Sequence, residues 1–189
     1  MPQLALYTFG VLKRTTRSPG RLTQEFDEFV GAIYGGMEHI PGYVTHAMPT
    51  DFGEGAYFDW DFREWGEFVA PNWYEKGRGP ETTALAATMS VWADVQSAYK
   101  FVYTELHRTA LNRRYDWFEK TGHPSHALWW VTDGTIPTWE DAVPRLEHLQ
   151  DHEPTPYAFT LQNAFTSDGA STRSREKQPI GKAAEARHG

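Results

Sequence analysis

The strongest constraint on the fold is the order in which strand-like and helix-like patterns alternate along the chain. Residues 4–13 form a nearly continuous apolar run, which predicts a buried strand. Residues 22–39 then place apolar side chains three and four positions apart, which predicts an amphipathic helix. Pro41 and Gly42 end this helix, and a second strand is predicted at 43–48.

The second half of the chain repeats the alternation and extends it. Asp94 and Thr138 are suitable helix caps, because their side-chain oxygens can accept hydrogen bonds from free backbone N–H groups. The predicted elements, in order, are a strand at 84–92, a helix at 95–117 that can break near Thr104, a strand at 127–132, a helix from Thr138 to about Leu149 and a short strand at 157–161.

This order of elements predicts an α+β fold: a ferredoxin-like antiparallel sheet with helices on one face. The other face then needs a cover, and the sheet of a partner chain would supply it, forming a dimeric α/β barrel. We therefore expect one domain over residues 1–165, assembled as a homodimer. Residues 166–189 contain almost no large apolar side chains, which predicts a disordered tail.

Residues 51–83 fit neither a helical nor a strand period and hold nine aromatic side chains in 33 residues. A connection of this length without regular structure is unusual in a compact domain unless it is a lid or a binding loop. The alternative is a flap packed on the core or on a dimer partner. The sequence leaves both interpretations open.

Composition excludes several classes of chemistry and partner. The chain has no Cys, which excludes disulfides, thiolate-ligated metals, iron–sulfur clusters and a cysteine nucleophile. The net charge of −7 makes the surface a poor match for phosphate backbones, so we expect no nucleic-acid partner. No apolar run is long enough to cross a membrane, and no signal peptide is recognisable, so we expect a cytoplasmic protein.

Several motifs in the second half resemble those of an uncharacterised bacterial family, a domain of unknown function in the dimeric α/β-barrel superfamily, which is antibiotic-biosynthesis-monooxygenase-like. The match covers about residues 4–165, without the tail, and segment 51–83 is longer than the usual connection of that family. The motifs are Ser90-Val91-Trp92, Phe101-Val102-Tyr103, His107, Arg113-Arg114-x-x-Trp117-Phe118, Ala127-Leu128-Trp129-Trp130-Val131, Gly134-x-Ile136-Pro137-Thr138, Arg145-Leu146-Glu147-His148-Leu149 and Pro154-Thr155-Pro156-x-Ala158-Phe159-Thr160.

The resemblance implies dimerisation through the sheets and an apolar pocket between sheet and helices. In the wider superfamily one or two polar residues in such a pocket act on a bound small molecule. Its members include cofactor-free monooxygenases of aromatic polyketides, polyketide cyclases, lactone isomerases, hydroxynitrile lyases and haem proteins. Because a shared fold is a weak guide to chemistry, the site has to be argued from the residues.

Two histidines are the candidate proton-transfer groups. His107 lies four residues after Tyr103 and seven before Arg114, so one helix face would hold an imidazole, a phenol and a guanidinium. Arg114 or Arg113 could hold an enolate, a phenolate or a carboxylate. His46 alternates with Val44 and Met48 in a strand, and so faces either the pocket or the barrel rim. Each histidine also has a purely structural interpretation.

Aromatic and basic residues near these positions are candidate substrate contacts, although core packing explains them equally well. Asp59, Asp61 and Glu64 lack the spacing of a metal-ligand set, and His148 and His152 fit a solvated helix face, so we expect no metal site. The candidate substrate-binding residues are Tyr7, Phe9, Trp60, Trp65, Arg113, Trp117 and Trp129.

The leading hypothesis is a small-molecule enzyme without an organic cofactor. It would act on an apolar, aromatic or polyketide-like substrate, in secondary metabolism, by cyclisation, isomerisation, elimination or oxygenation. His107 or His46 would transfer the proton. One alternative is a haem protein with either histidine as axial ligand. Another is a non-catalytic module that binds a ligand or a protein partner through segment 51–83.

Overall fold

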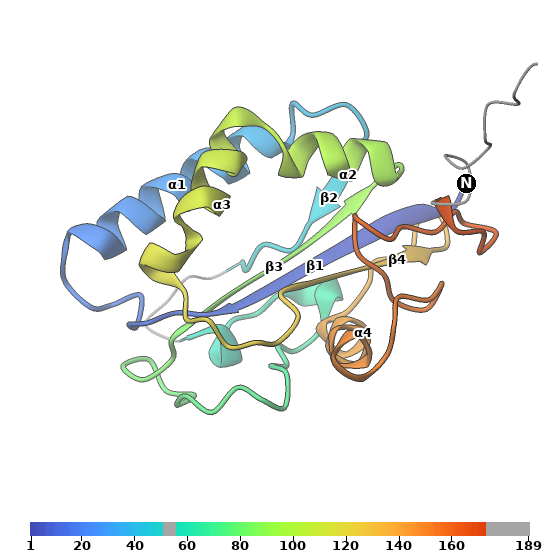
Figure 1. Cartoon of the computed structure of the whole chain (residues 1–189). Coiled ribbons are helices and arrows are strands. Elements are labelled where there is room, and N and C mark those ends of the chain that lie inside the picture. The colour runs from blue at the N-terminus through green and yellow to red at the C-terminus, as the bar shows by residue number, and fades with distance from the viewer. Residues whose placement is uncertain (51–55, 173–189) are drawn as a thin grey trace, which may run out of the picture.

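The computed structural model describes residues 1–50 and 56–172, and its centre is a four-stranded sheet. The strands are β1 (Gln3–Val11), β2 (Tyr43–His46), β3 (Leu85–Trp92) and β4 (His126–Val131). They lie in the order β2-β3-β1-β4, and each neighbouring pair is antiparallel (Figure 1). This order, with helices between β1 and β2 and between β3 and β4, is the ferredoxin-like arrangement. The predicted α+β class is therefore confirmed.

Three helices cover one face of the sheet: α1 (Arg21–Met37), α2 (Val95–Val102) and α3 (Glu105–Trp117) (Figure 1). The expected break separates α2 from α3. The side chain of Thr104 caps α3 by accepting from the backbone N–H of His107, and it donates to the carbonyl of Phe101. Because one side chain serves both helix ends, the break is a defined corner rather than a frayed turn.

The opposite face is covered by the chain itself. Residues 56–83, here called the aromatic flap, contain the short 3₁₀ turns η1 (Tyr57–Asp59) and η2 (Arg63–Trp65) and pack against this face together with α4 (Trp139–Asp151) (Figure 1). The expectation that all helices share one face is therefore corrected for α4. An amphipathic stripe shows that a helix buries one side, but not against which face of the sheet.

The aromatic flap is part of the core. Phe62, Trp65 and Phe68 are buried in the same cluster as Tyr7 of β1 and Trp139 of α4. The sheet surface that we expected to meet a partner chain is thus occupied within one chain. Of the two interpretations of this segment, the described part is a flap packed on the core, while residues 51–55 lie outside the described residues.

A tyrosine of the aromatic flap also completes the edge of the sheet. β2 is short, and beyond it no strand of the described residues lies beside the edge of β3. Tyr57 Oη donates to the carbonyl of Ala87 at 3.1 Å and accepts from the Ala87 N–H at 3.4 Å. One hydroxyl therefore takes the place of a strand partner at this position.

The C-terminal part differs from the prediction at two places. Residues 157–161, expected to form a strand, form isolated bridges instead. In the bridge that reaches the sheet, Leu128 and Phe159 exchange two backbone hydrogen bonds at the outer edge of β4. Residues 166–172, assigned to the tail, form a turn closed by the bond from Thr166 N–H to Ala170 O. Residues 173–189 lie outside the described residues. Within the described part of the chain, no helix is both long and apolar enough to span a membrane.

Candidate functional site

The helix-facing side of the sheet carries a group of polar residues. Leu4 and Leu6 of β1 point toward the helices, so Thr8, two residues further, points the same way. Thr8 is paired in register with Thr88 of β3 and His126 of β4. The hydroxyls of Thr8 and Thr88 are 2.7 Å apart. Both threonines and His126 remain partly accessible, so the helices do not seal this part of the sheet.

His46 lies at the end of β2 on the same side of the sheet. Its ring packs against Tyr34 of α1, with centroids 5.1 Å apart, and its Nδ1 lies 2.5 Å from the hydroxyl of Tyr43. Its Nε2 is buried and has no hydrogen-bond partner among the described residues. Burial lowers the pKa of His46, and Glu38 opposes this shift in part. The side chain is therefore a neutral imidazole at neutral pH.

His107 lies in the first turn of α3, beside the corner made by Thr104. Its ring packs on Phe101 at 4.9 Å, and its Nδ1 is buried without a partner in the described part of the chain. Burial lowers the pKa of His107, while a hydrogen bond to the backbone carbonyl of Phe101 opposes the shift. This imidazole is also neutral at neutral pH.

A row of aromatic contacts joins the surroundings of the two histidines. Phe101, beside His107, stacks on Trp92 at 4.9 Å, and Trp92 contacts Tyr43 at 5.7 Å. Tyr43 in turn contacts His46. The structure therefore places both predicted histidines on one side of the sheet, each with an unused ring nitrogen. We take this helix-facing layer as the candidate site.

The predicted companions of His107 do not join it. Tyr103 follows the end of α2, is 40% exposed and stacks on Tyr99. Arg114 is exposed and donates to the carbonyl of Leu111 at 2.7 Å. The break at Thr104 separates Tyr103 from the helix that holds His107, whereas Arg114 lies about two turns further along α3 and its guanidinium bonds the helix backbone.

Arg113 and Trp117 tie α1 to α3. The guanidinium of Arg113 bonds Glu25 of α1 at 2.7 Å and Asp116 at 3.0 Å, and lies 5.0 Å from the ring of Trp117. These contacts occupy the guanidinium and lower the pKa of Glu25. The Arg113 side chain thus links α3 to α1. Trp117 of α3 is buried and packs against Phe26 of α1.

The remaining candidate substrate contacts lie on the other side of the sheet. Tyr7, Phe9 and Trp129 point toward the aromatic flap, where Trp65 is 3% exposed and Trp60 packs on the same cluster. The sheet separates this set from both histidines, so the two groups cannot line one pocket. As expected, Trp129 and its neighbour Trp130 face opposite sides.

Sequence reasoning missed five polar residues of the helix-facing side. The signal for Thr8, Thr88 and His126 was present in the alternation of their strands. The contacts of Tyr34 and Tyr43 depend on packing and on an irregularity in β2, which periodicity does not reveal. The five residues are Thr8, Tyr34, Tyr43, Thr88 and His126.

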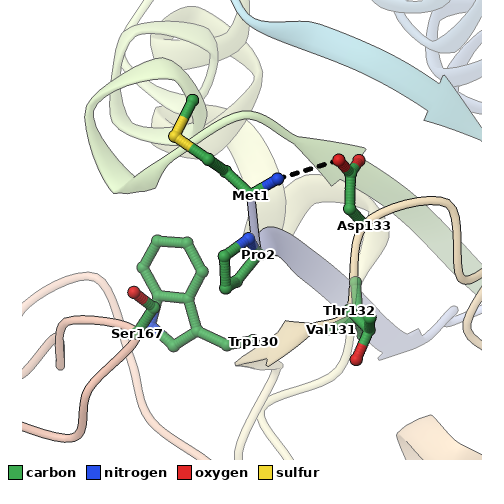
Figure 2. A pocket seen from close by; sticks show the side chains of 7 residues that line it. All are labelled: Met1, Pro2, Trp130, Val131, Thr132, Asp133 and Ser167. Carbon is green, nitrogen blue, oxygen red and sulfur yellow. Dashed lines mark hydrogen bonds and ion pairs between the residues drawn. The ribbon is translucent and has the colours of Figure 1, made fainter.

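Outside the helix-facing layer, the described residues offer a surface hollow but no group of metal ligands. Residues 1–50 and 56–172 contain no cluster of three or more His, Asp or Glu side chains placed to hold a metal ion. A surface hollow of about 360 Å³ lies at the end of β4, where the Met1 amino group meets Asp133 (Figure 2). It contains neither histidine. The residues that line it are Met1, Pro2, Trp130, Val131, Thr132, Asp133 and Ser167.

Fold and site together define a ferredoxin-like α+β protein with partly buried, neutral histidines between sheet and helices. The chain belongs to the family described as "Domain of unknown function (DUF3291)", whose model matches residues 3–176. This confirms the expected membership of a family of unknown function. No curated protein matches the chain.

Two solved structures are similar to this chain at low scores. One is a protein of unknown function, NE2512, from Nitrosomonas europaea, with 11% identity, a TM-score of 0.42 and coverage of 72% of this chain and 96% of that chain. The other is SnoaB from Streptomyces nogalater, a cofactor-independent oxygenase, with 10% identity, a TM-score of 0.41 and coverage of 72% and 99%. Similarity at this level carries no argument about activity.

Proposed function

We propose that the protein is a small-molecule enzyme that works without an organic cofactor and binds an aromatic or polyketide-like substrate on the helix-facing side of the sheet. The observation that carries the proposal is the pair of partly buried imidazoles, His46 and His107, each with one buried ring nitrogen that has no partner among the described residues. An unsatisfied buried polar atom is unfavourable, so its retention suggests that a bound molecule completes it.

The surroundings suit an apolar substrate. Along the inner side of α1, Phe26, Phe29, Val30 and Ile33 are only partly buried, and the sheet residues beneath the helices are also partly accessible. An apolar surface with a few polar groups is typical of a small-molecule site. A neutral imidazole can take a proton from a carbon beside a carbonyl or from a phenol. Such a step begins each of the reactions expected from the sequence.

Turnover of anthrone would test this proposal. Oxygen converts its methylene group to a carbonyl, giving anthraquinone and water, and the product is measured by absorbance. We expect His107→Ala and His46→Ala each to lower turnover by about 100-fold, within the usual range for general acid–base groups. His152→Ala, an exposed histidine on the other side of the sheet, should retain wild-type turnover.

Two outcomes would contradict the proposal. In the first, the double variant His46→Ala/His107→Ala keeps wild-type turnover. In the second, the wild type neither converts nor binds anthrone, 1-tetralone or 1-naphthol. Titration with haem tests the alternative of a haem protein. A Soret band that appears in the wild type and is lost in His46→Ala or His107→Ala would support that histidine as the axial ligand. We do not propose docking through the aromatic flap, because Phe62, Trp65 and Phe68 point into the core.

A further inference from the structure

We propose that Tyr43 is a positioning residue that fixes the proton of His46 on Nε2, so that His46 donates a hydrogen bond to an oxygen of the bound molecule while His107 acts as the base. The ligand class follows: an aromatic molecule with a phenol, enol or ketone oxygen. This inference rests on the proposed function for its ligand, although the state of His46 is measurable in the free protein.

An irregularity in β2 brings Tyr43 and His46 together. Tyr43 pairs with Trp92, and Thr45 pairs with the preceding residue Val91, so Val44 is an extra residue in the strand. In a regular strand, residues three apart face opposite sides. The bulge places the Tyr43 hydroxyl and the His46 ring on the same side, and Val44 turns outward with 40% exposure.

The backbone before the bulge is also fixed. Gly42 has φ +87°, and a Cβ at this position would lie 2.1 Å from Ser97 Oγ. Only glycine fits this position without strain or collision. The contact between Tyr43 and His46 therefore belongs to the backbone path of β2 and does not depend on a flexible side chain alone.

The proton positions follow from the hydrogen bonds. In the described part of the chain, the hydroxyl of Tyr43 has His46 Nδ1 as its hydrogen-bond partner, and its proton finds an acceptor there only if Nδ1 is unprotonated. Burial raises the pKa of Tyr43 and lowers that of His46, so neutral phenol meets neutral imidazole. The neutral ring then carries its single proton on Nε2, which is buried and unused.

His107 is suited to the complementary role. Its Nδ1 is buried and has no hydrogen-bond partner among the described residues, and burial lowers the pKa of the ring, so the imidazole is neutral at neutral pH. A neutral imidazole keeps one nitrogen lone pair, which can take a proton. His46 thus offers a proton and His107 can take one.

The two roles describe a balanced enolisation. The proton of a C–H bond beside a ketone moves to the unprotonated ring nitrogen of His107, and the electron pair of that bond forms the C=C bond of the enolate. The ketone oxygen takes up the negative charge and accepts the hydrogen bond from His46 Nε2–H. A phenol gives the analogous phenolate by loss of its O–H proton.

Imidazole NMR of the ¹⁵N-histidine-labelled full chain would test the state of His46. At pH 7.5 we expect a one-bond N–H coupling at Nε2 and a hydroxyl proton correlated with Nδ1. That correlation should disappear in Tyr43→Phe and persist in Tyr34→Phe, which alters a ring contact of His46 but none of its hydrogen bonds. A one-bond N–H coupling at Nδ1 of the wild type would overturn the proposal.

Binding of 1-naphthol and naphthalene would test the donor role. We expect the wild type to prefer 1-naphthol by about 5- to 10-fold, the worth of one hydrogen bond. His46→Leu should abolish this preference, and His46→Gln, which keeps an N–H donor, should restore part of it. An unchanged preference in His46→Leu overturns the donor role. If the wild type binds neither probe, the ligand assignment and the proposed function both fail, whereas the NMR result still decides the state of His46.

Discussion

At the scale of single residues, the two sides of the sheet use tyrosine hydroxyls differently. Tyr57 Oη both donates to and accepts from the backbone of Ala87. Tyr7 is 0% exposed, and its hydroxyl has no hydrogen-bond partner in the described part of the chain. The ring of Tyr7 packs on Trp139 within the core. Its ring therefore contributes to packing, whereas its hydroxyl contributes no hydrogen bond.

This difference predicts opposite effects for the same substitution. Tyr7→Phe should leave the free energy of unfolding unchanged or raise it by about 1 kcal/mol, because it removes an unpaired buried group. Tyr57→Phe should lower it by about 1–2 kcal/mol, because two backbone groups lose their partner. Urea unfolding of the two variants measures both. Equal destabilisation by the two substitutions would show that the Tyr7 hydroxyl has a partner, such as a buried water.

At the scale of elements, the sequence pattern of α4 predicted where the helix begins but not which face of the sheet it covers. The Thr138 cap and the acidic first turn were predicted, and the structure has a complete capping box between Thr138 and Asp141. The side of the sheet was not predicted, since the apolar stripe at Val143 and Leu146 fits either face. Local chemistry fixes where this helix starts, while its position depends on the aromatic flap beside it.

Loss of the Thr138 cap should destabilise α4, which covers one face of the sheet. Thr138→Ala is expected to lower the free energy of unfolding by about 1 kcal/mol, because the N–H of Asp141 and the Asp141 carboxylate lose the Thr138 hydroxyl. Thr135→Ala, at an exposed position in the loop before α4, is the matched control and should change stability by less than about 0.5 kcal/mol. Chemical denaturation measures both, and equal effects would argue against the cap.

At the scale of the whole molecule, the order of the elements was predictable and the arrangement around the sheet was not. Strand and helix periods are local, so they indicated the ferredoxin-like order. They could not show that residues 56–83 replace the partner sheet, because the eight aromatic side chains of this segment fit a lid, a flap or an interface equally well. The candidate site was recovered in part: His46 and His107 were found, but the helix break and the strand bulge changed their neighbours. Dimerisation stays a prediction, and it would need a surface other than the covered sheet face.

Three partly buried histidines make the stability of the molecule depend on pH. Burial lowers the pKa of His46, His107 and His126 in the folded protein. In the unfolded chain the same side chains have the ordinary histidine pKa of about 6.5. Below that pH the unfolded state holds more protons than the native state, so stability is fully present above about pH 6.5 and is lost as the pH falls toward the native pKa values. Urea unfolding at pH 7.5 and 5.5 should show a smaller loss for His126→Gln than for the wild type. Equal losses would contradict this origin.

The hydroxyl of Tyr57 at the edge of β3 has a consequence beyond this chain. An open strand edge offers unpaired N–H and C=O groups on which a strand of another molecule can add, and this is a common route to aggregation. Here the two groups of Ala87 are already bonded to one phenol. Between Tyr57 and the short β2, this edge is closed to recruitment by neighbouring molecules at high protein concentration.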